Sequence, residues 1–350
     1  MLTIRVFVVD DSAFMRKLIT DIISEQPDME VIATARNGQD ALNKLPKLSV
    51  DVITLDVEMP VMDGLTALQQ IMTLRPLPVI MLSSLTKQGS DITMKALSHG
   101  AIDFLPKPSG AISLDLHKIA DELVTKIRSA YGAKIHRPRQ IAPSIRMKPP
   151  IRSRVQSDSS LSTNLVVIGS STGGPRALEE VFIHLPANLK AGILVIQHMP
   201  KGFTRSFADR LNGISPLMVK EATNDDTIID GRALVAPGDY HMEITMNKQV
   251  ALNQDPPVQY LRPAVDVTML SVPKVFAGKN IIGVILTGMG RDGAAGMACI
   301  KENGGMTIAQ DKASSTIYSM PRVVYEEGNA DHVVSIDQVA DRIVNLVNSL

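Results

Sequence analysis

The sequence has a single cysteine, no net charge and no long apolar segment, and each of these shortages excludes a class of protein. With Cys299 as the only cysteine among 350 residues, the chain cannot form an internal disulfide, which is typical of proteins in a reducing compartment. Lysine and arginine together number 36, and so do aspartate and glutamate. Because no overall field attracts nucleic acid or an anionic membrane, we expect no nucleic-acid partner.

The apolar runs are too short to span a bilayer. The longest, such as "IIGVIL" at 281–286 and "ILVI" at 193–196, fall far short of the roughly 20 residues that a membrane-spanning helix requires. The opening residues, "MLTIRVFVVDD", lack the layout of a signal peptide. We therefore expect a cytoplasmic protein without membrane insertion.

A basic, proline-rich stretch divides the chain. Residues 132–160 contain seven lysines or arginines, one acidic residue and four prolines, without a regular apolar period. This composition is typical of an extended linker, and 350 residues are enough for two domains that each bury a core. We expect domains at residues 1–127 and 161–350, joined by a linker at 128–160.

The first domain alternates short apolar runs with amphipathic helical patterns. The runs are "IRVFVVD", "EVIATA", "VDVITLD", "LPVIMLSS" and "AIDFLPK". Strands that alternate with helices predict a doubly wound α/β fold, in which helices cover both faces of a parallel sheet. Ligands of such folds bind beyond the carboxyl ends of the strands.

Polar residues follow four of these runs and are expected at one sheet edge. They are Asp10, Asp11, Asp56, Ser83 and Lys107. Three close carboxylates repel one another, and a hard divalent cation such as Mg²⁺ relieves that repulsion. A carboxylate can also accept a phosphoryl group while a metal and a lysine offset its charge, and Asp56 is the best candidate. Each acid alone is more simply a cap or turn residue, but the set of five makes that interpretation improbable.

This domain resembles the receiver domain of two-component response regulators. The resemblance rests on "VFVVDDSAFMRKL", "DVITLDVEMPVMDGL", "VIMLSS" and "GAIDFLPKP" and covers nearly all of residues 1–127. It implies a flavodoxin-like fold with Asp56 as the phosphoacceptor. It also implies that Asp10 and Asp11 shape a Mg²⁺ site, in which Asp11, Asp56 and the backbone carbonyl of Glu58 are the protein ligands.

The same resemblance assigns three switch residues. Ser83 is the implied switch hydroxyl, and Lys107 is the implied partner of the phosphate. Phe104 stands at the aromatic switch position of the family, although an aromatic residue in "AIDFLPK" is, by itself, more often part of the core.

The second domain opens with a turn of small residues, "GSSTG" at 169–173, between an apolar run and a helical pattern. It fits the G-x-S-x-G pattern of a nucleophile elbow with Ser171 at the centre. A glycine-rich turn before a helix can instead bind an anion through its backbone amides. The turn lacks the G-K-[ST] of a P-loop, and Pro175 removes one amide donor from the helix start.

A nucleophilic serine requires a base and an acid that orients the base. His198 follows one apolar run, and Asp292 lies in the glycine-rich loop after another, so both are expected at the same sheet edge as Ser171. The alternatives that the residues leave open are His184 and His241 for the base, and Asp239 and Asp266 for the acid.

Five blocks of the second domain resemble the chemotaxis protein-glutamate methylesterase (CheB) family. They are "IGSSTGGPRAL", "QHMPKGFTRSFADRL", "APGDYHM", "RPAVDV" and "GVILTGMGRDGAAGM". The resemblance covers 164 to about 345 and implies a second doubly wound, mostly parallel α/β domain. It makes Ser171 the nucleophile, His198 the general base and Asp292 the orienting acid.

Supporting roles follow from the same resemblance. The resemblance assigns the backbone N–H of Met289 to the oxyanion hole. It also implies that Thr172 and Arg205 support the site. The implied reaction removes methyl groups from glutamate γ-methyl esters on the cytoplasmic domains of methyl-accepting chemoreceptors, with deamidation of specific glutamines as a second activity. Both reactions share a tetrahedral transition state, and ester hydrolysis is expected to need no cofactor.

The two resemblances together predict regulation. A chemotaxis histidine kinase would donate the phosphoryl group to Asp56, and phosphorylation would activate the hydrolase. Three alternatives remain: a phosphorylation-controlled binding module, a response regulator that binds DNA, and an esterase of another chemosensory pathway. No helix-turn-helix pattern follows the linker, which argues against DNA binding.

Overall fold

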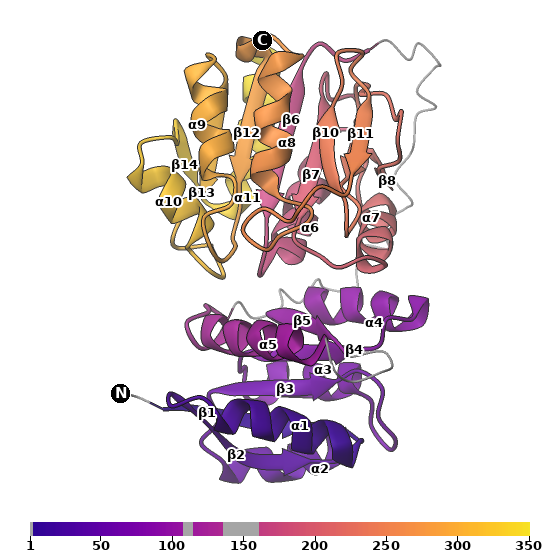
Figure 1. Cartoon of the computed structure of the whole chain (residues 1–350), viewed down its shortest axis with the longest axis vertical. Helices are drawn as coiled ribbons and strands as arrows, with labels where there is room; N and C mark the ends of the chain where they lie inside the picture. Colours follow the sequence, from indigo (N-terminus) through magenta and orange to yellow (C-terminus); the bar gives the residue numbers. More distant parts are fainter. Residues whose placement is uncertain (1–2, 108–114, 136–160) are drawn as a thin grey trace. The chain divides into compact units, whose positions relative to one another are not determined.

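The computed structural model describes residues 3–107, 115–135 and 161–350, and the chain divides into two compact units, Met1–Gln140 and Ile141–Leu350 (Figure 1). Residues 136–160 of the expected linker lie outside the described part. Helix α5 (Asp115–Tyr131) continues past residue 127, so the first residues assigned to the linker are helical. Among the described residues, no helix is both long and apolar enough to cross a bilayer.

The first unit contains a five-stranded parallel sheet in the order β2-β1-β3-β4-β5. Each apolar run of the sequence contains one of its strands, and the order is that of flavodoxin-like folds, as predicted. The strands are β1 (Ile4–Val9), β2 (Met29–Ala35), β3 (Val52–Asp56), β4 (Val79–Ser83) and β5 (Asp103–Pro106).

Helices cover both faces of this sheet. Residues that alternate along β1, such as Val6 and Val8, pack with α1 and α5 in one apolar cluster. Side chains cap the helix starts: Ser12 accepts a hydrogen bond from the amide of Met15, as expected for an N-cap. The remaining helices are α1 (Ala13–Ser24), α2 (Gly38–Lys44), α3 (Gly64–Leu74), α4 (Lys87–Ser98) and the short 3₁₀ helix η1 (Leu45–Lys47).

The second unit contains a seven-stranded parallel sheet in the order β14-β13-β12-β6-β7-β9-β8, beside an antiparallel pair, β10-β11. The sheet strands are β6 (Leu165–Ser170), β7 (Gly192–Gln197), β8 (Met218–Glu221), β9 (Arg232–Val235), β12 (Ile281–Ile285), β13 (Met306–Gln310) and β14 (His332–Val334). The pair consists of β10 (His241–Ile244) and β11 (Val250–Asn253). The predicted doubly wound, mostly parallel α/β fold is confirmed.

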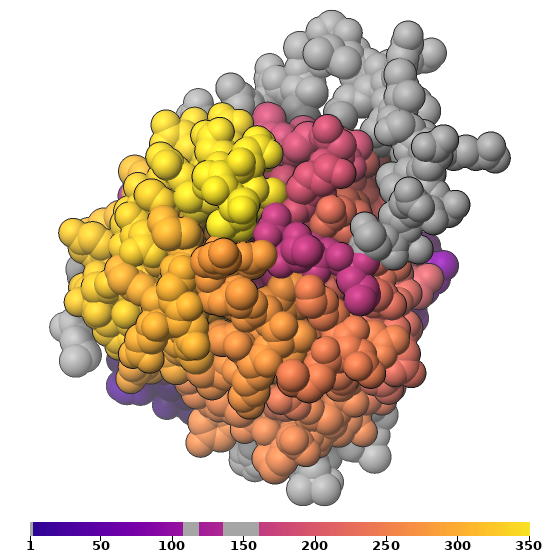
Figure 2. All heavy atoms as spheres, turned by 90° about the horizontal axis from the view of Figure 1, so that it is seen from above, coloured from indigo at the N-terminus to yellow at the C-terminus, as the bar shows by residue number. Residues whose placement is uncertain are grey.

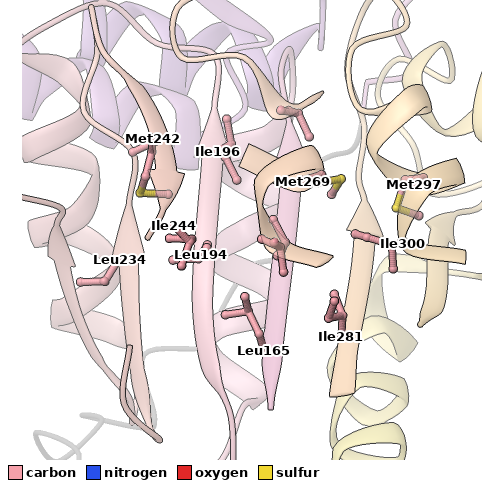
Figure 3. Close-up of a cluster of buried hydrophobic side chains, with 14 of the residues drawn as sticks. Leu165, Leu194, Ile196, Leu234, Met242, Ile244, Met269, Ile281, Met297 and Ile300 are labelled. Atoms are coloured by element: carbon pink, nitrogen blue, oxygen red, sulfur yellow. The ribbon is translucent and has the colours of Figure 1, made fainter. Parts of the chain in front are cut away.

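Helices also cover both faces of this second sheet. Met269 of α8 and Met297 and Ile300 of α9 pack over Leu165 and Ile281 of the strands (Figure 3). On the other face α11 lies beside α6, as the yellow and pink surfaces in Figure 2 show. The helices are α6 (Gly174–His184), α7 (Phe203–Ile214), α8 (Val265–Ser271), α9 (Ala294–Glu302), α10 (Met320–Glu326), α11 (Ile336–Ser349), and the 3₁₀ helices η2 (Val272–Lys274) and η3 (Gly278–Asn280).

The direction of winding reverses at β6. The chain leaves β6 for β7 on one side, and it later returns to β12 on the other side. Doubly wound sheets form a crevice at such a switch point, beyond the carboxyl ends of the two strands. The fold therefore places the residues that follow β6 and β12, including Ser171, at the position where ligands are expected.

Candidate active site

Ser171 lies directly beyond β6 and is fixed by both neighbouring strands. Its N–H donates a hydrogen bond of 3.0 Å to the carbonyl of Thr287, beyond β12. On the other side, the side-chain amide of Gln197, the last residue of β7, donates to the carbonyls of Ser171 at 3.0 Å and His198 at 3.2 Å. The backbones of Ser171 and His198 are therefore neighbours, bridged by one buried amide group.

The turn at Ser171 joins the end of β6 to the start of α6. The positive φ angle falls on Gly173, at +77°, whereas Ser171 has an ordinary φ. Gly173 is the N-cap of α6 and takes this conformation without the clash that a Cβ atom would add. Two turn amides are used internally, since Ser171 N–H bonds to Thr287 and Gly174 N–H donates to the carbonyl of Ser171 at 2.7 Å. This use of the amides argues against a phosphate cradle.

His198 and Asp292 form a buried pair across the end of β6. Nε2 of His198 lies 2.7 Å from Oδ2 of Asp292, and the two side chains are 7% and 1% exposed. The pair joins a residue that follows β7 to a residue that follows β12, so it spans the strand from which Ser171 emerges. The ring nitrogen that remains for a proton from Ser171 is Nδ1. Among the described residues, no hydrogen bond links the Ser171 hydroxyl to His198.

Backbone amides hold the Asp292 carboxylate in place. The N–H groups of Val265 and Asp266, at the start of α8, donate to Oδ2 at 2.6 Å and to Oδ1 at 2.9 Å. Burial acts to raise the pKa of Asp292, but the hydrogen bonds from His198 and from these amides outweigh burial and lower it. Asp292 is therefore suited to remain ionised and to orient the imidazole.

Asp266 lies beside Asp292 and behaves in the opposite way. Its carboxylate accepts the N–H of Gly296 at 2.8 Å, in the first turn of α9. Burial, and then the charge of Asp292, raise the pKa of Asp266 to about 6 against this opposing hydrogen bond. Two neighbouring carboxyl groups with displaced pKa values are a common feature of active sites.

Apart from Asp266, the alternative bases and acids have other partners than the His198–Asp292 pair. His184 ends α6, with Nδ1 at 2.8 Å from the carbonyl of Glu180. His241 is buried against the backbone of Ala264. Asp239 forms an ion pair with Arg262. None of these three is hydrogen-bonded to Ser171 in the part of the chain that the structure describes.

The three expected supporting residues lie around the same sheet edge in different settings. The carbonyl of Thr172 accepts a hydrogen bond from the hydroxyl of Thr287 at 3.0 Å, which ties the turn to the end of β12. Met289 follows β12 and is 41% exposed. Arg205 lies on α7 and pairs with Asp209 of the same helix, with both side chains largely exposed. Among the described residues, no hydrogen bond or ion pair links Arg205 to Ser171, His198 or Asp292.

Two residues that build the site, Gln197 and Gly288, have no recognisable pattern in the sequence. Gln197 is buried and also accepts a hydrogen bond from the hydroxyl of Ser170 at 2.7 Å. Gly288 allows close approach, because a Cβ atom there would lie 2.8 Å from the Cβ of Ser171. Gln197 directly precedes His198 in the sequence, but no residue pattern indicates that its side chain turns back between two strands.

The first unit brings the expected acidic residues together at the carboxyl edge of its sheet. Carboxylate oxygens of Asp10, Asp11 and Asp56 lie within 4.8 Å of one another. Lys107 lies 2.9 Å from Asp10 and 2.8 Å from Asp56. Burial raises the pKa of Asp56 to about 6, opposed by Lys107 and assisted by Asp10. Burial acts to lower the pKa of Lys107, but the two carboxylates outweigh it and raise it. This oxygen-only donor set fits a hard divalent cation.

The expected switch residues flank this cluster. The buried hydroxyl of Ser83 lies 2.7 Å from the hydroxyl of Thr93 on α4. Phe104 is also buried, and the ammonium of Lys126 lies 5.9 Å from the centre of its ring. Glu58 has an exposed side chain, and its N–H donates to the carboxylate of Asp56 at 3.3 Å. The hydroxyl and the aromatic ring of the expected switch are therefore both held inside the unit.

Comparisons with known proteins agree with both halves of the structure. The profile of the CheB methylesterase family matches residues 166–343, and that of the response regulator receiver domain matches residues 6–118. The chain is 47% identical to a protein-glutamate methylesterase/protein-glutamine glutaminase of Pyrococcus abyssi, a match that covers 99% of this chain and 94% of the relative. For a protein of the same description from Symbiobacterium thermophilum the identity is 48%, and the coverage is 98% and 97%.

A solved structure supports the fold of the second unit. The crystal structure of the Thermotoga maritima CheB methylesterase catalytic domain matches 53% of this chain and 100% of that chain, with a TM-score of 0.51 and 42% sequence identity. Together with the two profile matches and the full-length relatives, this likeness shows that the chain belongs to the CheB methylesterase family and carries a response regulator receiver domain in addition to the methylesterase domain.

Proposed function

We propose that the chain is a phosphorylation-activated serine hydrolase that removes methyl groups from glutamate γ-methyl esters of chemoreceptors and deamidates specific receptor glutamines. The observation that carries the hydrolase is the buried His198–Asp292 pair, which spans the strand end from which Ser171 emerges. The relatives that match almost the whole chain are named for these two activities.

In the proposed reaction, Ser171 attacks the ester carbonyl while Nδ1 of His198 takes its proton. The amide of Met289 stabilises the oxyanion of the tetrahedral intermediate. His198 returns the proton to the leaving oxygen, so methanol departs and the glutamyl group remains esterified to Ser171. Water, deprotonated by His198, then releases a glutamate carboxylate and restores the serine. Asp292 orients the imidazole throughout and stabilises its charged form.

The proposed reaction needs a hydrogen bond between the side chains of Ser171 and His198, whose backbones are already neighbours. The side-chain amide of Gln197 already donates hydrogen bonds to the carbonyls of both Ser171 and His198. In the proposed reaction the hydroxyl of Ser171 donates to Nδ1 of His198 while Nε2 stays bound to Asp292. Catalytic hydrogen bonds often tighten only when substrate is bound.

The receiver domain supplies the proposed control. Asp56 is the acceptor of the phosphoryl group, Lys107 pairs with that group, and Ser83 and Phe104 transmit the change. Asp10, Asp11 and Asp56, with the carbonyl of Glu58, would hold Mg²⁺, which offsets negative charge on the phosphoryl group when bound. A chemotaxis histidine kinase is the proposed phosphoryl donor, and we propose that the hydrolase step itself needs no cofactor.

The cellular compartment that we propose for the protein follows from its proposed substrates. Methylated glutamates lie on the cytoplasmic domains of methyl-accepting chemoreceptors, so an enzyme that acts on them works in the cytoplasm. Each turnover leaves one more negative charge on the receptor. This change is the chemical signal of chemotaxis adaptation in the proposed function.

The variant Ser171→Ala tests the hydrolase. We expect the release of methanol from methylated receptor membranes to fall by at least about 10³-fold, because the nucleophile is lost. Methanol is measured by gas chromatography, and mass spectrometry of receptor peptides reports deamidation. The control is Ser349→Ala, which removes an exposed hydroxyl of α11. If Ser171→Ala keeps the activity of the unmodified chain, the serine hydrolase assignment is wrong.

A further inference from the structure

Asp266 occupies a junction that the proposed hydrolytic steps do not use. Its side chain is only 7% exposed and its carboxylate accepts the N–H of Gly296 at 2.8 Å, while its own N–H donates to Asp292 at 2.9 Å. One residue thus connects the start of α9 with the acid that orients His198. A buried carboxyl group that serves only to cap a helix has no need to lie against a second carboxylate.

The structure assigns Asp266 as a positioning residue of the hydrolytic site. It acts through Asp292, whose carboxylate its backbone fixes and whose negative charge its ionised side chain reinforces, and so it increases the basicity of His198. This inference rests on the proposed function and deepens it, because it concerns the same site. It adds to the proposed triad a residue whose backbone N–H binds Asp292 and whose side chain binds the start of α9.

The first argument is geometric. Asp292 accepts three hydrogen bonds: one involves His198, and the other two come from consecutive amides at Val265 and Asp266. The rotation of α8 about its axis determines where these amides point. Because the side chain of Asp266 anchors the same turn of α8 to Gly296, it controls that rotation.

The second argument is electrostatic. The carboxyl groups of Asp266 and Asp292 interact, and burial together with this repulsion raises the pKa of Asp266 to about 6. Above about pH 6 both groups are ionised, and the charge of Asp266 beside Asp292 adds to the negative potential at the carboxylate that binds the imidazole. A base with greater proton affinity is a stronger proton acceptor for the serine hydroxyl.

Other titratable groups near α8 are engaged elsewhere. Helix α8 packs against α9, β10, β6, β7 and η2. His241 on β10 accepts the N–H of Ala264, and Glu243 on β10 binds the side chain of Asn253. Lys301 on α9 pairs with Asp331. The remaining ionisable residues of these elements are Lys274, Cys299 and Glu302. Asp292 is the charged side chain that acts on Asp266.

The test measures the titration of His198 directly in the intact chain. The protein is labelled with ¹⁵N in its seven histidine rings, and His198 is assigned by comparison with His198→Gln. Asp266→Asn keeps a side-chain oxygen that can accept the N–H of Gly296 but removes the charge. Asp341→Asn is the matched control, because Asp341 is exposed on α11.

We expect the His198 midpoint in Asp266→Asn to fall by about half a pH unit or more, and we expect Asp341→Asn to titrate like the unmodified chain. The acid limb of kcat/KM for p-nitrophenyl acetate should move to lower pH by the same amount. A purely structural role would lower kcat and thermal stability without moving either midpoint. An unchanged or raised His198 midpoint in Asp266→Asn overturns the inference.

The unmodified chain provides a second readout if Asp266→Asn does not fold. The ring signal of His198 should then show two inflections, its own and a second one near pH 6 from Asp266; a single inflection overturns the inference. Because the resonance experiment needs no turnover, its failure is distinct from failure of the proposed function. Failure of the proposed function would instead appear as full activity in Ser171→Ala, with the expected fall of the His198 midpoint in Asp266→Asn still observed.

Discussion

At the scale of single residues, folding shifts the pKa values of two neighbouring aspartates in opposite directions. Hydrogen bonds lower the pKa of Asp292 below its usual value, so its contribution to stability is present above about pH 4 and is lost as the pH falls through its folded pKa. Asp266 has a raised folded pKa of about 6. Its contribution is complete below its unfolded pKa and is lost as the pH rises through about 6.

The stability of Asp266→Asn should therefore depend on pH in a defined direction. Relative to the unmodified chain, the variant should gain about 1–2 kcal/mol between pH 4 and pH 7.5, after allowance for solvent screening, because the cost of ionising a buried carboxyl is removed. Differential scanning calorimetry of the intact chain measures this trend. Asp341→Asn, which removes an exposed carboxylate, should show no such trend. A stability difference that stays constant with pH would contradict the raised pKa.

At the scale of helices and strands, tight contact between strand ends determines where the serine lies. A Cβ atom at residue 288 would lie 2.8 Å from the Cβ of Ser171 and 2.3 Å from the sulfur of Met320. The sulfur can move, but the serine is held on both sides by Thr287 and Gln197. The position of Ser171 therefore depends on the lack of a side chain at Gly288, in the loop that follows β12.

Gly288→Ala should accordingly weaken the enzyme. We expect a loss of about 1–3 kcal/mol in the free energy of unfolding and at least a tenfold fall in kcat, because the added methyl group displaces Ser171. Methanol release and calorimetry measure the two effects. Gly213→Ala is the control, since Gly213 ends an exposed turn of α7 with open space around it, and alanine favours helix. Equal behaviour of the two variants would contradict the proposed crowding.

Much of this layout could be predicted from the sequence, because apolar runs locate strands and parallel strands share one edge for their carboxyl ends. That reasoning correctly located Ser171, His198 and Asp292 beyond β6, β7 and β12. It could not reveal the bridge made by Gln197, because that depends on which strands become neighbours. Nor could it reveal that the positive φ of the turn falls on Gly173.

At the scale of the whole molecule, the receiver and the hydrolase are separate compact units, each with its own sheet and its own polar strand ends. In the receiver, Asp56 faces Lys107, and the hydroxyl of Ser83 is held by Thr93 of α4. Addition of a phosphoryl group to Asp56 would compete for both Lys107 and Ser83. The proposed control of the hydrolase starts from this change of partners.

Asp56→Ala in the intact chain tests that control. With acetyl phosphate and Mg²⁺, we expect methanol release by the unmodified chain to rise several-fold, and removal of Mg²⁺ with EDTA should abolish the rise. Asp56→Ala should show the basal rate under both conditions, because no acceptor remains. Asp21→Ala, which removes an exposed carboxylate of α1, should respond like the unmodified chain. An equal response of Asp56→Ala would refute regulation through this residue.

The strand order of the second unit also determines when activity can arise during synthesis. The ribosome makes β6 and β7, with Ser171 and His198, long before it makes β12 and Asp292, yet β12 pairs directly with β6. A nascent chain therefore carries the proposed nucleophile, Ser171, before it carries Asp292, the proposed partner of the imidazole. If the proposed triad is correct, hydrolytic competence arises only when about the last fifth of the chain is made, and products truncated before β12 lack it.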